Sequence, residues 1–232
     1  MPPPRSEPTK KSRTRGQTAN NNGCLSGFLI PPFAALCVSA LLAVFVAGFT
    51  NAPDGSLPKT PPAAGSSGTL STLFTPEIQF WAASLQRWAA ENGVDVNLAA
   101  TVMQIESCGN PDARSSSGAM GLFQVMPFHF LASENGYDPD TNAHRGLDYL
   151  RRSLERANGD ARLALAGYNG GIAVIGRAES TWPAETQRYV YWGAMYDDAA
   201  QNADHSTRLD EWKQATGNSL CIRASQRLGI KP

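Results

Sequence analysis

Apolar residues recur at helical spacing through the second half of the chain. Ala143, Leu147, Leu150 and Leu154 lie three or four residues apart, with mostly polar and charged residues between them. Residues that typically begin or end helices divide this part of the chain at short intervals: Pro76, Gly93, Asp95, Gly159–Asp160, Gly170–Gly171 and Pro183. The first expected helix runs from Pro76 to about Gly93. Because no apolar–polar alternation is long enough for a substantial sheet, the pattern predicts a mainly α domain over residues 73–228.

The N-terminal part of the chain has a different composition. Residues 1–23 are polar, with five basic residues against one acid, which predicts a disordered basic tail. Residues 24–50 carry no charge, and the apolar stretch 28–49 is long enough to cross a bilayer as a helix. The basic residues before it predict a cytoplasmic tail and an exported C-terminal domain. A cleaved signal peptide is the alternative.

The rest of the composition adds a linker and excludes some functions. Pro, Gly and Ser are frequent in residues 51–72, which we expect to form a flexible tether. The chain of 232 residues has a formal net charge of zero, so nothing indicates a nucleic-acid partner. No metal or organic cofactor is implied by any motif.

The four cysteines form two groups along the chain, one of them in the predicted domain. Cys24 and Cys37 flank or lie in the apolar stretch, whereas Cys108 and Cys221 belong to the domain. No C-x-x-C spacing indicates a zinc site. An exported domain would lie in an oxidising compartment, so we predict a disulfide between Cys108 and Cys221. Two buried free thiols are the alternative.

Glu106 is chemically the most unusual residue of the helix expected after Asp95. It follows Leu98 by eight positions and Val102 by four, so it shares their apolar face. Burial and the negative end of the helix dipole both disfavour its ionised form and raise its pKa. Such a carboxyl group suits general-acid catalysis. A helix-end glutamate that simply reaches solvent is the alternative.

Four segments around and after Glu106 form a distinctive series: IESCGNPDARSSSGAMGLFQVMP (residues 105–127), DPDTNAHRGLDYL (138–150), ALAGYNGG (164–171) and WPAETQRYV (182–190). In order and spacing they resemble the motifs of the soluble lytic transglycosylase family, which has a lysozyme-like fold. The resemblance covers roughly residues 95–190 and implies that Glu106 is the catalytic acid/base. It also implies a set of residues that line the substrate cleft: Ser115, Gln124, Met126, Tyr168, Asn169 and Glu185.

For several other residues the sequence supports only general predictions about their position. Gly167 departs from the family pattern, in which Ala is usual, and this bears on cleft shape. The aromatic residues near the C-terminal end of the resemblance are expected mainly in the core: Trp182, Tyr189, Tyr191, Trp192 and Tyr196. His129, His144 and His205 have no metal-ligand spacing, so surface or capping positions are expected for them.

The resemblance implies an enzyme that cleaves the β-1,4 bond between N-acetylmuramic acid and N-acetylglucosamine in peptidoglycan, outside a bacterial cell membrane. Ordinary glycosidases use two carboxylates, whereas only Glu106 has a plausible buried position here. A lytic route needs one: Glu106 protonates the leaving oxygen and then takes a proton from the sugar's C6 hydroxyl, which closes a 1,6-anhydro ring. A hydrolytic muramidase and a non-catalytic peptidoglycan-binding protein are the alternatives.

Overall fold

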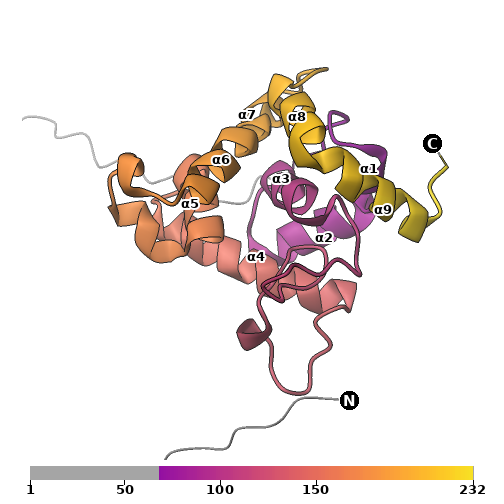
Figure 1. Cartoon of the computed structure of the whole chain (residues 1–232), viewed down its shortest axis with the longest axis horizontal. Helices are drawn as coiled ribbons and strands as arrows, with labels where there is room; N and C mark the ends of the chain where they lie inside the picture. The colour runs from indigo at the N-terminus through magenta and orange to yellow at the C-terminus, as the bar shows by residue number, and fades with distance from the viewer. Residues whose placement is uncertain (1–67, 232) are drawn as a thin grey trace, which may run out of the picture. The chain divides into compact units, whose positions relative to one another are not determined.

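The computed structural model describes residues 68–231, which form a mainly α domain, as predicted (Figure 1). The helical elements are α1 (Pro76–Phe80), α2 (Ala82–Asn92), α3 (Val96–Ser107), η1 (Pro127–His129), α4 (Pro139–Arg156), α5 (Ala161–Gly170), η2 (Ile172–Gly176), η3 (Glu179–Thr181), α6 (Ala184–Gly193), α7 (Met195–Ala200), α8 (Thr207–Trp212), η4 (Lys213–Gly217) and α9 (Asn218–Leu228). Within residues 68–231, β pairing is limited to two isolated bridges, Arg114–Met120 and Met120–Val125.

The N-terminal predictions concern a part of the chain that the structure does not describe. The basic tail 1–23, the apolar segment 24–50 and most of the linker 51–72 lie outside the described residues. Among the helices at residues 68–231, none combines the length and the apolar character needed to cross a membrane. The tail, anchor and linker therefore stay predictions.

Most helix boundaries agree with the capping residues in the sequence. Asp95 begins α3, where its carboxylate accepts hydrogen bonds from the backbone N–H groups of Asn97 and Leu98, and Asp160 caps α5 in the same manner. One expectation was wrong: the helix predicted from Pro76 to Gly93 is two helices, α1 and α2, separated at Trp81. Its indole N–H donates to the carbonyl of Gly109, 2.9 Å away, a tertiary contact that local sequence does not encode.

Helix α3 is the buried centre of the domain. It contacts α1, α2, α6, α7 and α9, and in Figure 1 it lies among them. Eleven of its twelve residues are buried, and Glu106 is the exception. The sequence predicted an apolar stripe on one face, but neighbours from both ends of the domain cover the helix on all sides. Glu106 is therefore the residue through which α3 reaches the surface.

Helix α5 packs closely between α4 and α6. Ser153 on α4 donates a hydrogen bond to the carbonyl of Ala164, 2.8 Å away. A Cβ atom at Gly167 would lie 2.2 Å from the Ser153 hydroxyl oxygen and 2.6 Å from a side-chain carbon of Ile175. The glycine that departs from the family pattern therefore permits the close approach of α5 to α4 and η2.

The long loop between α3 and α4 is fixed by Asn142, a buried amide on α4. Its side-chain oxygen accepts from the backbone N–H of Phe123 at 2.8 Å. Its nitrogen donates to the carbonyls of Met120 and Gly136 at 2.7 and 2.8 Å. A Cβ atom at Gly121 would approach this amide nitrogen to 2.4 Å. Because all three bonds join one side chain to the loop backbone, they set the position of the adjoining residues 124–126.

Candidate active site

Glu106 lies in the last turn of α3 and is partly buried. It opens into a cavity of about 430 Å³. Residues from α5, from α6 and from the C-terminal helices complete the wall: Asn169, Glu185, Arg188, Tyr189, Trp192, Trp212, Ala215 and Thr216. The candidate acid thus faces a hollow built by segments that are distant in sequence.

The surroundings of Glu106 favour its protonated form. Burial is the main cause, and it raises the pKa of Glu106 to about 8; the hydroxyl of Tyr189 opposes this rise, whereas the negative charge of Glu185 adds to it. Because this pKa lies above neutral pH, the carboxyl group carries a proton there. Glu106 is therefore prepared to act as a proton donor.

Tyr189 has a buried hydroxyl that faces this carboxyl group. The hydroxyl interacts with Glu106 closely enough to affect its pKa. It nevertheless completes no hydrogen bond of good geometry within the described part of the chain. A buried donor of this kind is usually paired, so the hydroxyl is available to Glu106 after ionisation or to a bound ligand.

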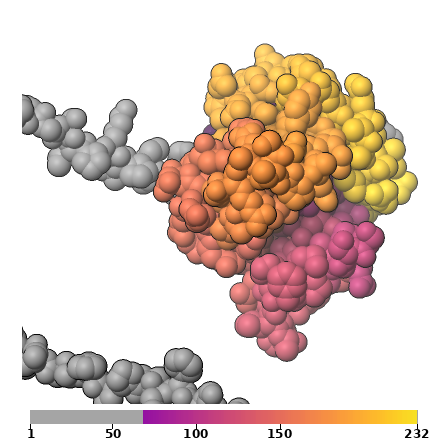
Figure 2. Space-filling view, turned by 60° about the vertical axis from the view of Figure 1, so that its left-hand side comes forward, coloured from indigo at the N-terminus to yellow at the C-terminus, as the bar shows by residue number. Residues whose placement is uncertain are grey.

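A second cavity of about 290 Å³ adjoins the first at Asn169, which lines both. Its wall combines the loop before α4 with α4, the end of α5 and the turn after it: Gln124, Val125, Met126, Phe128, His129, Gly146, Tyr149, Tyr168, Asn169, Gly170 and Gly171. In Figure 2 the orange surface of α5 and α6 meets the magenta-to-pink surface of this loop. Together the two cavities form a cleft that passes the candidate acid.

The residues predicted for the cleft are brought together, with one exception. Gln124, Met126 and Tyr168 line the second cavity, Glu185 lines the first, and Asn169 lies in both. Ser115 lines neither of them. Its hydroxyl accepts a hydrogen bond from the backbone N–H of Ala119 at 3.0 Å, so in this structure it closes a turn of the loop.

Several cleft residues are held in place by their own hydrogen bonds. The Gln124 backbone has a φ of 45°, which is unusual for a residue other than glycine. Its amide nitrogen donates to the carbonyls of Ala113 and Gly121 at 3.1 and 2.9 Å. The Tyr168 hydroxyl donates to the carbonyl of Phe123 at 2.7 Å, and burial, followed by the charge of Glu106, raises its pKa well above the ordinary value. Tyr168 is therefore a fixed, neutral wall of the cleft.

Sequence reasoning did not place three residues or segments in the cleft. Tyr189 is buried in the core, as expected, but it also lines the first cavity, one helical turn after Glu185 and on the same helix face. His129 was assigned to the surface but lines the second cavity. The C-terminal segment around Trp212 and Thr216 lies beyond every motif, so no local signal indicated its place in the first cavity.

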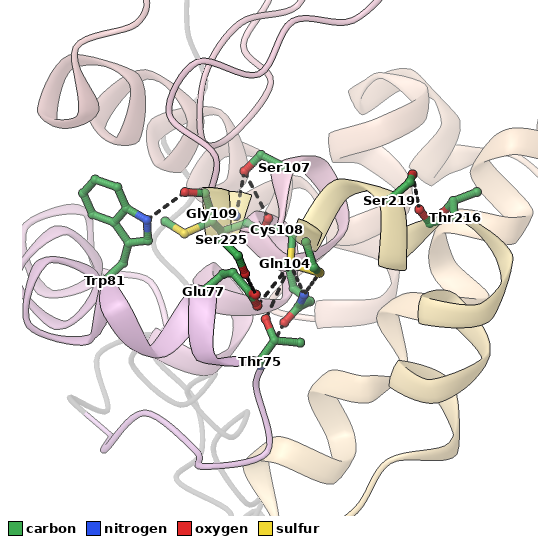
Figure 3. Close-up of a disulfide and its surroundings, with 12 residues drawn as sticks. Thr75, Glu77, Trp81, Gln104, Ser107, Cys108, Gly109, Thr216, Ser219 and Ser225 are labelled. Atoms are coloured by element: carbon green, nitrogen blue, oxygen red, sulfur yellow. Dashed lines mark hydrogen bonds between the residues drawn. A yellow bond between two sulfur atoms is a disulfide. The ribbon is translucent and has the colours of Figure 1, made fainter. Parts of the chain in front are cut away.

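Cys108 and Cys221 form the predicted disulfide, with an S–S distance of 2.00 Å. Figure 3 shows Cys108 at the end of α3, close to Gln104 and to residues of α1. The buried amide of Gln104 accepts from the backbone N–H of Thr75 at 3.2 Å and donates toward the Cys108 sulfur at 3.1 Å. The disulfide and these hydrogen bonds connect α1, α3 and α9. They thereby place η4, the segment that precedes α9, beside Glu106.

One group of metal-type donor atoms occurs within residues 68–231. Glu77, Cys108 and Cys221 place a carboxylate oxygen and two sulfur atoms within 4.8 Å of one another. The two sulfur atoms are joined in the disulfide, however, and a thiolate is the form of cysteine that binds metals. The carboxylate of Glu77 instead accepts a hydrogen bond from the hydroxyl of Ser225.

Comparison with known proteins agrees with this geometry. Residues 83–190 match the family described as Transglycosylase SLT domain. Over these residues the domain is similar to the transglycosylase SLT family. The matched range contains Glu106 and the whole of the second cavity, whereas the SLT match ends before the residues of α8 and η4 that complete the first cavity.

Two curated proteins that are similar to part of the chain are named as transglycosylases. The "Transglycosylase" of Enterobacteria phage PRD1 is 39% identical over 114 residues, which are 48% of this chain and 40% of that protein. The "Membrane-bound lytic murein transglycosylase E" of Buchnera aphidicola subsp. Acyrthosiphon pisum (strain APS) is 31% identical over 86 residues, 32% of this chain and 39% of the relative. The chain thus spans about two fifths of the length of these relatives.

A solved structure was also found to be similar. It is the X-ray structure of an inactive mutant of lytic transglycosylase Slt from Pseudomonas aeruginosa. The sequence identity is 23% and the TM-score is 0.38, over 65% of this chain and 24% of that chain.

Proposed function

We propose that the domain cleaves the β-1,4 bond between N-acetylmuramic acid and N-acetylglucosamine in peptidoglycan, with Glu106 as the acid and then the base. The observation that carries the proposal is the state of Glu106: it is the accessible residue of a buried helix, it faces a cleft, and its pKa is raised to about 8. The match to the SLT family over residues 83–190 and the relatives named as transglycosylases support the same reaction.

The reaction begins with proton transfer from Glu106 to the glycosidic oxygen as the bond to the sugar C1 breaks. The leaving sugar departs with this proton, and the N-acetyl group of the substrate stabilises the oxocarbenium-like centre. Glu106, now a carboxylate, accepts a hydrogen bond from the unpaired Tyr189 hydroxyl beside it. It then takes the proton of the C6 hydroxyl, whose oxygen bonds to C1 and closes the 1,6-anhydro ring. Glu106 ends the cycle protonated.

A hydrolytic muramidase is the second candidate, because a second carboxylate lines the same cavity. Glu185 is exposed on the first turn of α6 and its charge acts on Glu106. A pair of carboxylates is the arrangement that glycoside hydrolases use to activate water or to attack the sugar. Glu185 is exposed to solvent, whereas Glu106 is partly buried. We favour the lytic route, in which the nucleophile is the C6 hydroxyl of the substrate.

The products of digestion distinguish these reactions. We expect the full-length protein to release 1,6-anhydromuramic ends from purified peptidoglycan, each lighter by one water than a reducing end, as measured by mass spectrometry. The Glu185→Gln variant should give the same anhydro products, because it removes only a neighbouring charge. Reducing ends in place of anhydro ends would establish the hydrolase, and the absence of any product would contradict both reactions.

We also propose that residues 28–49 anchor the protein in a bacterial cell membrane, with residues 51–72 as the tether of an extracytoplasmic domain. The uncharged apolar run and the basic residues before it support this topology, and one relative is named as membrane-bound. We expect the full chain to stay in the membrane fraction after an alkaline wash. Its release into the supernatant would contradict the anchor.

A further inference from the structure

A row of aromatic rings extends along the second cavity away from Glu106. Tyr168 contacts Tyr149 edge to face, with ring centroids 5.8 Å apart. Tyr149 contacts His129 at 5.1 Å, and His129 contacts Phe128 at 4.4 Å. All four residues line the cavity that adjoins Glu106 at Asn169. The row therefore continues the cleft from the candidate acid to the surface of the loop before α4.

The outer end of this row is left in contact with solvent. Phe128 lies on η1 and is 74% exposed, the highest value among the large hydrophobic residues of the described chain. Exposed apolar surface that continues into a cavity is characteristic of a binding site, because contact between an apolar side chain and water does not stabilise the folded domain. The other three rings are partly buried, which fixes the orientation of the row.

The charges around the row favour a neutral ligand. Burial, followed by the nearby Arg152, lowers the pKa of His129, so its ring is uncharged at neutral pH. The guanidinium of Arg152 lies 5.2 Å from the Tyr149 ring, and it is paired with Asp148 at 3.1 Å. Uncharged rings suit the apolar face of a sugar better than the carboxylate and ammonium groups of a peptide.

We propose that Phe128, His129 and Tyr149 form a stacking platform for a sugar of the glycan strand, beyond the sugars at the scissile bond. This inference rests on the proposed function, because the strand must pass Glu106 to reach the platform. The platform is a specificity-determining surface: it binds a sugar that does not react. Longer glycans are therefore bound more tightly than short ones, and Phe128 contributes most of the difference as the outermost ring.

The test uses glycan length as its variable. In the full-length Glu106→Gln variant, we expect binding of peptide-free peptidoglycan oligosaccharides, measured by calorimetry, to tighten as they lengthen. Adding Phe128→Ala should weaken binding of the longest oligosaccharide by roughly three- to tenfold and leave the shortest unchanged, the effect expected of one lost aromatic contact. Phe128→Trp should preserve the length dependence, whereas Phe128→Leu, which is apolar but not flat, should lose it. Phe80→Ala is the matched control, because Phe80 is 55% exposed but lines neither cavity.

Every other outcome contradicts the proposed platform, and each one also shows whether the proposed function still holds. If Phe128→Ala leaves all lengths unchanged, or weakens them equally, the proposed function stands and the platform is wrong. If weakening appears only with glycans that carry stem peptides, the occupant is a peptide. If the Glu106→Gln variant binds no glycan of any length, the proposed function itself fails.

Discussion

Replacing Glu106 by glutamine is expected to lower the rate of glycan cleavage by about 10²–10⁴-fold, the range attributed to general acid–base catalysis. Glutamine has nearly the same shape as glutamic acid but has no acidic proton to transfer. The cleft should therefore keep its form while turnover is lost. Product release from purified peptidoglycan, followed at neutral pH for both proteins, measures the effect. A variant with nearly full activity would place the acid elsewhere.

The same substitution is expected to stabilise the fold, by about 1–3 kcal/mol at pH 7 after allowance for the partial exposure of the side chain. The ordinary pKa of a glutamate is 4.5, and in the folded protein it rises to about 8. Between these values the unfolded chain is ionised at Glu106 whereas the folded chain is protonated, so folding must take up a proton. Above pH 8 the folded state contains a charge that burial disfavours. Glutamine avoids both costs.

The advantage of the glutamine variant should therefore be absent at pH 4, grow as the pH rises from about 4.5, and level off above about 8. Urea unfolding of both proteins at pH 4 and pH 8 measures it, with Glu91→Gln on the exposed surface of α2 as the control. The cleavage rate of the unmodified protein should fall as the pH rises through about 8, because Glu106 loses its proton. Equal stabilities at pH 8 would show that Glu106 is not a buried, protonated group.

Reduction of the Cys108–Cys221 disulfide is expected to lower the free energy of unfolding by about 3–5 kcal/mol, because the bond closes a loop across 113 residues of sequence. Cleavage should fall as well, since α9 then loses its covalent link to the end of α3 and η4 is no longer fixed at the first cavity. Urea unfolding and product release, with and without a dithiol reductant, measure both effects. The Cys108→Ser, Cys221→Ser double variant should reproduce them without reductant.

A matched control separates this disulfide from the other two cysteines. The Cys24→Ser, Cys37→Ser double variant keeps Cys108 and Cys221, so reductant should destabilise it as much as the unmodified chain. Unchanged stability on reduction would mean that packing alone keeps α9 beside α3. Unchanged activity with lower stability would mean that the wall of the first cavity does not depend on the bond.

The helix boundaries predicted correctly from the sequence are those with local causes. Asp95 and Asp160 begin helices because a side chain caps the backbone a few residues later. The break at Trp81 depends on a hydrogen bond to Gly109, 28 residues away, and could not be read locally. The burial of α3 on all sides likewise depends on α7 and α9, which follow it far along the chain.

The candidate site shows the same division. Glu106 was identified by its position on a helix and by the motif around it, and both are local in sequence. Tyr189 shares a helix face with Glu185, but which face of α6 turns toward α3 is decided by packing. Ser115 illustrates the reverse case: its motif position implied a cleft residue, whereas here its hydroxyl bonds to the backbone N–H of Ala119.

The position of the C-terminal helices has a practical consequence for how the protein should be produced. The family match ends at residue 190, yet Trp212, Ala215 and Thr216 line the same cavity as Glu106, and Cys221 is bonded to Cys108, two residues after Glu106. A fragment trimmed to the matched range would expose the flank of α3 to water and lower the pKa of its acid. Shortened forms for assay or crystallisation should therefore extend through Leu228, and should be made where thiols oxidise.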